Sequence, residues 1–179
     1  MTVLELNYLV ALGTIALQIG AVVLLGVYLF RNNPAVAPLA DLAGKWGLAF
    51  GFLLTLVSAV MSLVYSEIYG VVPCGLCWIQ RVFIYSQVVV FGVARFLKDV
   101  RAAWYAIWLS IFGAVVSLYH HYIQISDSST LPCPASGGDC GKRFIYEFDY
   151  ITFPLVAFSM LAFVIILMLL VLARSKRNG

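Results

Sequence analysis

The sequence has few charged residues. Asp, Glu, Lys and Arg make up only 11% of its 179 residues, whereas about 25% is usual in soluble domains. Histidine is also scarce, with two residues, and the net charge is only +3. This scarcity of charge excludes an ordinary soluble domain and gives no basic patch for binding nucleic acid. The abundant residues are hydrophobic, at 63%, and the mean hydropathy is +1.00. The chain therefore belongs in a lipid bilayer, and its length suits one compact domain.

The hydrophobic residues lie in five long runs. Each run is close to the ~20 residues that cross ~30 Å of hydrocarbon as a helix. A lipid-exposed backbone must satisfy its own hydrogen bonds, so we expect helices. The runs cover about Tyr8–Phe30, Trp46–Tyr65, Trp78–Leu97, Ala103–Tyr122 and Ile151–Ala173. The sequence predicts an all-α, polytopic membrane helical bundle with five spans.

A cleaved signal peptide is the alternative for the first run. No Lys or Arg precedes Tyr8, although a signal peptide has a positively charged n-region. The run is also longer than the apolar core of about 7–15 residues that signal peptides have. We therefore interpret it as a transmembrane helix.

The positive charges predict the orientation. With five spans, eight of the 11 Lys and Arg residues fall on one side: Arg31, Lys45, Arg95, Lys98, Arg101, Arg174, Lys176 and Arg177. The positive-inside rule assigns that side to the cytoplasm. The C-terminus is then cytoplasmic, and the N-terminus and the loops at residues 66–77 and 123–150 lie outside.

The four cysteines occur as two pairs in these outer loops. Cys74 and Cys77 form a C-x-x-C motif, and Cys133 and Cys140 lie in the largest polar loop. Outside the cytoplasm disulfides persist, so two structural disulfides are one interpretation. Redox chemistry is the other, because C-x-x-C thiols are typically reactive. Cys77 also directly precedes the run that starts at Trp78, and a helix N-terminus favours a thiolate.

A zinc site built from the four cysteines is a further alternative. One C-x-x-C pair fits half of such a site, but the second pair is separated by seven positions instead of three. We therefore predict no metal.

Three further polar residues lie near the cysteines. Arg81 follows Cys77 by four residues, about one helical turn and ~6 Å along the same face. An ionisable residue inside a span points to function, here stabilising a thiolate or the oxygen of a quinone. The alternative is an arginine that reaches the headgroups. His120 and His121 end the fourth run, where either could bond a quinone oxygen, relay protons or contact headgroups.

We expect two parts of the polar loop to behave differently. Residues 126–130 and 132–141 are rich in turn-forming residues, so we expect mobility there. The stretch Phe144–Phe148 places large apolar residues among charges. It either lies along the membrane surface or extends the last helix.

The motif around the first cysteine pair resembles a known family. Pro73-Cys74-Gly75-Leu76-Cys77-Trp78-Ile79-Gln80-Arg81 is similar to the P-C-x-L-C-x-x-x-R signature of disulfide bond formation protein B (DsbB) and its Gram-positive counterparts. The later cysteines, with Phe153-Pro154 after them, also fit. The resemblance implies a four-helix DsbB-like membrane domain over residues 46–179. Residues 1–45 would then be an additional N-terminal transmembrane helix and a cytoplasmic loop.

The resemblance also implies an activity. Such a protein is a quinone-dependent thiol oxidase of the bacterial cytoplasmic membrane. It re-oxidises a DsbA-like, thioredoxin-fold protein in trans and passes the electrons to ubiquinone or menaquinone. It thereby supports disulfide formation in exported proteins.

The family's functional residues map onto this sequence one by one. Cys133 would form the mixed disulfide with the partner, and Cys140 would be its pairing cysteine. Electrons would pass to Cys74 and Cys77. Cys77 would contact the quinone, which Arg81 and His120 or His121 would bind.

Two alternatives to this family remain. Vitamin K epoxide reductase is also a helical bundle with a quinone-facing C-x-x-C, but there the loop cysteines precede the motif. Here they follow it. A non-enzymatic membrane scaffold stapled by two disulfides is the alternative from a different class.

Overall fold

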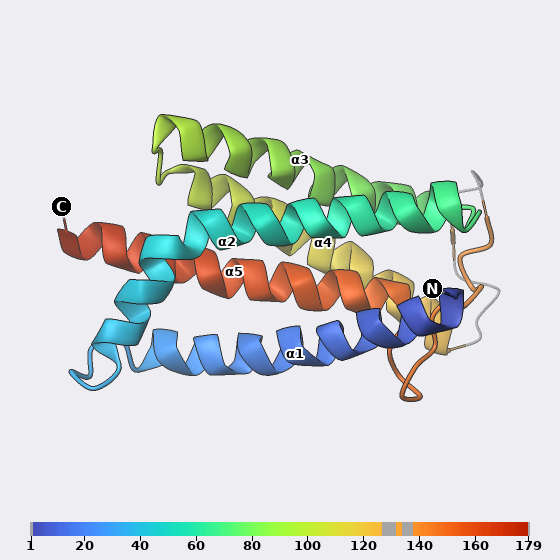
Figure 1. The fold of residues 1–179 in the computed structure, drawn as a ribbon, viewed down its shortest axis with the longest axis horizontal. Coiled ribbons are helices and arrows are strands. Elements are labelled where there is room, and N and C mark those ends of the chain that lie inside the picture. The colour runs from blue at the N-terminus through green and yellow to red at the C-terminus, as the bar shows by residue number, and fades with distance from the viewer. Residues whose placement is uncertain (1, 127–131, 134–137, 179) are drawn as a thin grey trace.

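The structure is a computed structural model that describes residues 2–126, 132–133 and 138–178. It contains five long α-helices, α1 to α5, and a short π-helical turn, η1, that continues α2 (Figure 1). Their bounds are Val3–Leu29, Ala37–Leu63, Val64–Ile68 for η1, Gly75–Leu97, Ala102–Ile125 and Phe153–Asn178. All five α-helices are long and apolar enough to cross a membrane. Within the described residues there is no strand beyond two isolated bridges. The predicted all-α bundle with five spans is confirmed.

Helix α5 forms the centre of the bundle. It packs against α1, α2 and α4. In Figure 1, α1 lies below α5, α2 and α3 lie above it, and α4 passes behind it. The core residues Leu161, Val164 and Met168 of α5 are fully buried. Small residues let the neighbouring helices approach closely, as is usual in membranes. A Cβ on Gly113 of α4 would lie 2.9 Å from Leu161 Cδ1 and 3.1 Å from Phe83 Cβ, so three helices meet there.

Three helices, α1, α2 and α3, begin several residues earlier than the hydrophobic runs predict. α2 begins at Ala37, with Pro38 in its first turn, so Lys45 is helical and not part of a loop. α3 begins at Gly75, and Cys74 is its N-cap. Cys77 lies at the helix N-terminus, as expected, but inside the first turn, because α3 begins three residues before the hydrophobic run at Trp78. Hydrophobicity marks where a helix enters lipid, whereas capping decides where it begins.

The two ends of the bundle differ in charge. The α1–α2 and α3–α4 connections and the C-terminus lie at one end, and the N-terminus and both cysteine loops lie at the other (Figure 1). Lys45, Arg95 and Lys98 line one hollow at the first end, and Arg177 pairs there with Asp41. The basic residues that predict a cytoplasmic side are thus remote from the cysteines.

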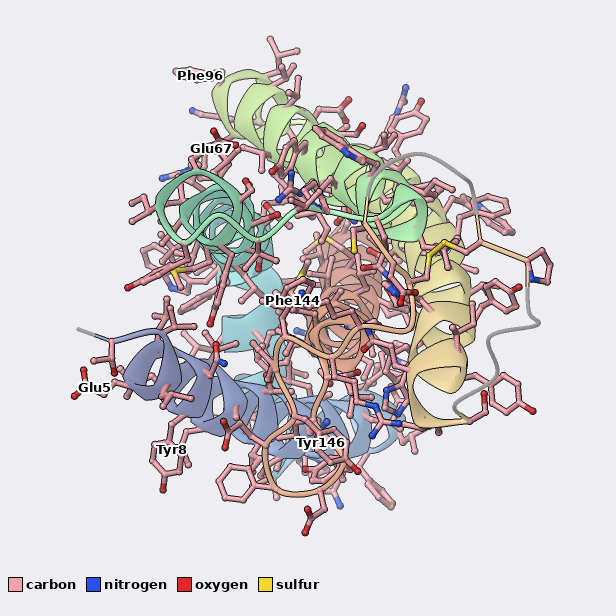
Figure 2. All side chains as sticks on the ribbon, turned by 90° about the vertical axis from the view of Figure 1, so that its right-hand side faces the viewer. Glu5, Tyr8, Glu67, Phe96, Phe144 and Tyr146 are labelled. Carbon is pink, nitrogen blue, oxygen red and sulfur yellow. A yellow bond between two sulfur atoms is a disulfide. The ribbon has the colours of Figure 1, made fainter. Side chains whose placement is uncertain are left out.

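The segment after Cys140 packs against α1. Figure 2 looks onto the cysteine end of the bundle, where this segment lies. Asn7 of α1 bonds the Phe144 carbonyl, and Tyr8 of α1 contacts the Phe148 ring. Phe144–Phe148 is not an extension of α5, which begins only at Phe153. The expected mobility of the polar loop falls mainly on residues 127–131 and 134–137, which lie outside the described part of the chain.

Candidate active site

Cys74 and Cys77 lie together in the first turn of α3. Cys74 has extended backbone angles (φ −76°, ψ 172°), which free its side chain to cap the helix. Its sulfur accepts a hydrogen bond from the Cys77 backbone N–H at 3.3 Å. The two sulfurs are 2.7 Å apart, and a disulfide needs about 2.05 Å. Only a small side-chain movement therefore separates this geometry from that of a disulfide between the two cysteines.

Cys133 and Cys140 form a disulfide in the outer loop, with their Cα atoms 6.3 Å apart. Cys140 is buried, with 3% of its surface exposed, whereas Cys133 is partly exposed. Tyr119 of α4 supports this bond by donating to the Pro132 carbonyl at 2.9 Å. The disulfide thus presents one sulfur to solvent and keeps the other inside.

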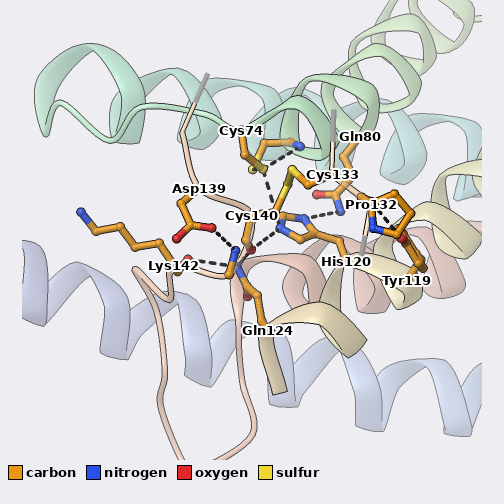
Figure 3. The surroundings of a disulfide bond; sticks show 12 residues. Cys74, Gln80, Tyr119, His120, Gln124, Pro132, Cys133, Asp139, Cys140 and Lys142 are labelled. Carbon is orange, nitrogen blue, oxygen red and sulfur yellow. Dashed lines mark hydrogen bonds between the residues drawn. A yellow bond between two sulfur atoms is a disulfide. The ribbon is translucent and has the colours of Figure 1, made fainter. Parts of the chain in front are cut away.

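The two cysteine pairs are neighbours. Cys74 and Cys140 belong to one buried cluster, into which Cys77 and Cys133 also pack (Figure 3). Gly138 holds the loop in place by donating its N–H to the Pro73 carbonyl at 3.3 Å. A Cβ at Gly138 would lie 2.8 Å from the Val72 carbonyl oxygen, so this close approach requires glycine. The arrangement allows thiol–disulfide exchange between the pairs.

His120 lies between the two pairs and is fully buried. Its Nε2 is 3.7 Å from Cys74 Sγ and 3.1 Å from the Cys140 carbonyl oxygen. A carbonyl only accepts, so Nε2 carries the proton and donates. Nδ1 is then free to accept from the Gln80 side-chain amide at 3.3 Å. These contacts fix the ring, and the one Nε2–H is shared between the Cys140 carbonyl and the more distant Cys74 sulfur.

These donors favour the thiolate form of Cys74. The Cys77 thiol is the largest influence, and it lowers the pKa of Cys74 to about 4 together with His120 and the Cys77 backbone N–H. Burial opposes them. The contacts of Cys74 with the Cys77 backbone N–H and with His120 therefore favour Cys74 as the thiolate of the reduced pair.

His121 has a different environment from His120. Its Nδ1 is 2.8 Å from the Thr152 hydroxyl, just before α5. Adjacent residues on a helix point about 100° apart, so only one of the two faces the cysteines. The structure therefore divides the predicted histidines: His120 contacts Cys74, and His121 joins α4 to the start of α5.

Arg81 is buried between α3 and α2. Its Nε donates to the Ser62 hydroxyl at 2.8 Å, and its Nη2 donates to the Ser62 carbonyl at 2.9 Å. The guanidinium also lies over the Trp78 ring, 5.0 Å from its centroid. Only 9% of Arg81 is exposed, so it does not extend to the headgroups. Its charge stays one turn below Cys77.

The end of α2 shapes this arginine site. Val64–Ile68 forms a π-helical turn directly after Ser62 and Leu63. Such turns shift the hydrogen-bonding register of a helix and are frequent at functional sites. Ser62 lies where the register changes, and its carbonyl is directed at Arg81. Nothing in the sequence marks Ser62 as a site residue.

Two further polar residues of the site carry only a weak sequence signal. Gln80 bonds His120, and Gln124 donates to the Lys142 carbonyl at 3.1 Å and the Cys140 carbonyl at 3.4 Å. Both are buried. Polar residues inside a span usually join helices. Gln80 of α3 does so by bonding His120 of α4, which is the site histidine.

The disulfide decides against the four-cysteine zinc site. Cys133 and Cys140 are bonded to each other, so neither offers a thiolate to a metal. Cys74, Cys77 and His120 retain ligand atoms within 4.8 Å of one another. His120 directs a protonated nitrogen at this cluster, and that nitrogen would have to lose its proton to bind a metal.

Comparison with known proteins identifies the family. The family model "Disulfide bond formation protein DsbB" matches residues 44–173. The SPbeta prophage-derived disulfide bond formation protein B of Bacillus subtilis is 31% identical over 70% of this chain and 85% of its own length. Disulfide bond formation protein C of the same species is 33% identical, over 71% and 91%.

A third relative is the probable disulfide formation protein C of Halalkalibacterium halodurans. It is 36% identical over 70% of this chain and 93% of its own length. No solved structure matches significantly. The matched region contains both cysteine pairs, Arg81 and both histidines, whereas α1 lies outside it. The chain belongs to the DsbB family of disulfide bond formation proteins, and it is a multi-pass membrane thiol oxidoreductase with a role in disulfide formation.

Proposed function

We propose that this protein re-oxidises a DsbA-like, thioredoxin-fold dithiol protein and passes the electrons to a membrane quinone. The observation that carries the proposal is the single buried cluster that joins the Cys133–Cys140 disulfide to Cys74, with Cys77 and Arg81 below it. One pair reaches solvent through Cys133, and the other begins a transmembrane helix. This order suits transfer from a soluble protein to an acceptor in lipid.

The first exchange takes place at the loop disulfide. A partner thiolate attacks the Cys133 sulfur, the Cys133–Cys140 bond breaks, and Cys140 leaves as a thiolate. The partner's second thiol then displaces Cys133, so the partner gains a disulfide and the loop becomes a dithiol. The partial exposure of Cys133 and the burial of Cys140 support attack at Cys133.

The second exchange transfers the electron pair inward. The Cys133–Cys140 dithiol is re-oxidised as the Cys74–Cys77 disulfide is reduced. Two electrons and two protons move in total, and each step exchanges one disulfide for another. His120 directs its Nε2–H at Cys74 and so stabilises a thiolate there.

The residues below the C-x-x-C pair fit a quinone. Arg81 has five N–H donors, of which it uses two on Ser62; the described residues offer no hydrogen-bond partner for the others. Trp78 and Val82 next to it are exposed apolar residues on a membrane-spanning helix. A bound quinone would supply a two-electron, two-proton acceptor, and Arg81 would hold its carbonyl oxygen. Ubiquinone and menaquinone both have this carbonyl.

We infer the orientation of the protein in the membrane from the basic residues at one end of the bundle. The basic end would face the cytoplasm of a bacterium, and the N-terminus and both cysteine loops would lie outside the cytoplasmic membrane. This orientation gives Cys133 access to exported partners. It also keeps the disulfides in an oxidising compartment.

The experiment is a steady-state assay with purified protein, a quinone and a reduced thioredoxin-fold dithiol protein. We expect Cys77→Ser and Cys133→Ser to abolish quinone reduction. Arg81→Met should raise the quinone KM about tenfold or more, because one charge-assisted hydrogen bond contributes ~1.5–3 kcal/mol. The control is Arg95→Met on the same helix, at the opposite end of the bundle, and it should change neither value.

The contrary result is equally clear. If both cysteine variants turned over normally, the oxidase proposal would fail. A disulfide-stapled scaffold would lose thermal stability in the Cys133→Ser variant and would show no quinone reduction in any form.

A further inference from the structure

The first helix, which lies outside the family match, touches the loop that carries Cys140. Asn7 of α1 donates from Nδ2 to the Phe144 carbonyl at 3.0 Å. Its Oδ1 accepts from the Tyr65 hydroxyl at 2.8 Å. Asn7 and Tyr65 are each only 4% exposed. One buried amide therefore links α1, the π-helical turn after α2 and the outer loop.

Apolar contacts surround this amide. Leu6 and Ala11 of α1 share one buried cluster with Tyr65, Ile145 and Ile151. The ring of Tyr8 on α1 lies 5.8 Å from that of Phe148. Ile145, within Phe144–Phe148, and Ile151, after it, thus have their buried side chains in a cluster that they share with α1.

The loop segment itself ends in a tight turn. Phe148 and Asp149 have left-handed φ values of 54° and 60°, and hydrogen bonds between Glu147 and Ile151, at 3.1 and 2.9 Å, close the turn around them. The Phe148 ring at this turn contacts the Tyr8 ring of α1. The turn is thus formed by the loop, and its ring contact joins it to α1.

The same loop is held from its other side by α4. Gln124 donates to the Cys140 and Lys142 carbonyls, and His120 donates to the Cys140 carbonyl. Asn7 bonds the carbonyl only two residues beyond Lys142. The loop between Cys140 and Phe144 is thus fastened between α4 and α1.

We propose that α1 is a positioning element of the redox site, in which Asn7 holds the Cys140 loop against Cys74. The inference rests on the proposed function insofar as Cys140 must exchange with Cys74. A helix that served only as an additional lipid anchor would need no buried amide directed at the loop. In lipid an unpaired amide is costly, which favours the bonded arrangement.

The test measures how readily Cys140 reaches Cys74 and needs neither partner nor quinone. The full-length protein with Cys77→Ser and Cys133→Ser retains only these two cysteines. Equilibration with glutathione gives the effective concentration of one thiol at the other. We expect Asn7→Leu to lower this effective concentration about three- to tenfold, which is the effect of losing one or two hydrogen bonds inside a membrane protein.

Three further variants make the test specific. Asn7→Asp keeps an acceptor for Tyr65, and at a pH where its carboxyl is ionised it cannot donate to Phe144, so under that condition it should act like Asn7→Leu. Tyr65→Phe keeps the bond to Phe144 and should have a smaller effect. Thr14→Val is the control, since Thr14 is buried on α1 but bonds only its own helix at Val10; it should leave the value unchanged.

Every outcome bears on the proposal. A drop with Asn7→Leu and Asn7→Asp, without one in Thr14→Val, supports it. An unchanged value in folded Asn7→Asp protein with its carboxyl ionised overturns it, and so does an equal drop in Thr14→Val, which would indicate a general effect of α1 packing. Because the assay contains no quinone, a failed oxidase assay would leave this result interpretable.

Discussion

Replacing His120 by Phe should raise the pKa of the Cys74 thiol. The substitution keeps the volume of an aromatic ring but removes the Nε2–H that lies 3.7 Å from Cys74 Sγ. The adjacent His121 provides a matched control, because its ring bonds Thr152 instead. His121→Phe should leave the Cys74 pKa where it is.

The size of the effect follows from the contacts. The pKa of Cys74 is lowered from 9.0 to about 4, mainly by the Cys77 thiol and secondarily by His120. A hydrogen bond to a charged group contributes ~1.5–3 kcal/mol, and about 1.4 kcal/mol corresponds to one pKa unit. The Nε2–Sγ distance is long, so the lower figure applies. We expect His120→Phe to raise the pKa by about one unit.

The assay is the pH dependence of iodoacetamide alkylation. Reduced protein with Cys133→Ser and Cys140→Ser reports only Cys74 and Cys77. A lowered pKa keeps the thiolate present above that pKa, so alkylation is fast at neutral pH and declines as the pH falls through the pKa. In His120→Phe this decline should occur at a higher pH. If it did not move, or moved equally in His121→Phe, the role assigned to His120 would be refuted.

Two other substitutions test the arginine site and the helix packing. Ser62→Ala removes one acceptor of Arg81 and should raise the quinone KM about two- to tenfold; Ser58→Ala, whose hydroxyl bonds its own helix, should not. Gly113→Ala should lower thermal stability by ~1–3 kcal/mol, because the added methyl meets Leu161. Gly13→Ala, which has nothing within 4 Å, should be neutral or slightly stabilising in the same unfolding experiment.

The sequence predicted the number of helices more accurately than the residues at which they begin. The thickness of the bilayer sets the length of the hydrophobic run that crosses it, so the five spans could be predicted from the lengths of the runs. The N-cap role of Cys74 could not be predicted, because it depends on the backbone angles of Cys74, which the pattern of polar and apolar residues does not determine. The same limit hid the helical start of α2 at Ala37.

The candidate site was predictable where neighbours in sequence are neighbours in space. Cys77 and Arg81 share one helix, so their proximity followed from the helical repeat. The contacts of Arg81 with Ser62, and of Asn7 with Phe144, join residues far apart in the chain. Only tertiary packing determines such pairs, and neither Ser62 nor Asn7 stands in a motif.

The most direct test of the account is an anaerobic single-turnover experiment. Purified protein loaded with quinone is mixed with a reduced thioredoxin-fold dithiol protein, and quinol and partner disulfide are quantified together. We predict equal amounts of both products in the unaltered protein, and no quinol when Cys77 is replaced by Ser. Partner disulfide formed without quinol in the unaltered protein, or quinol formed at an unchanged rate in Cys133→Ser, would contradict electron transfer through the two cysteine pairs.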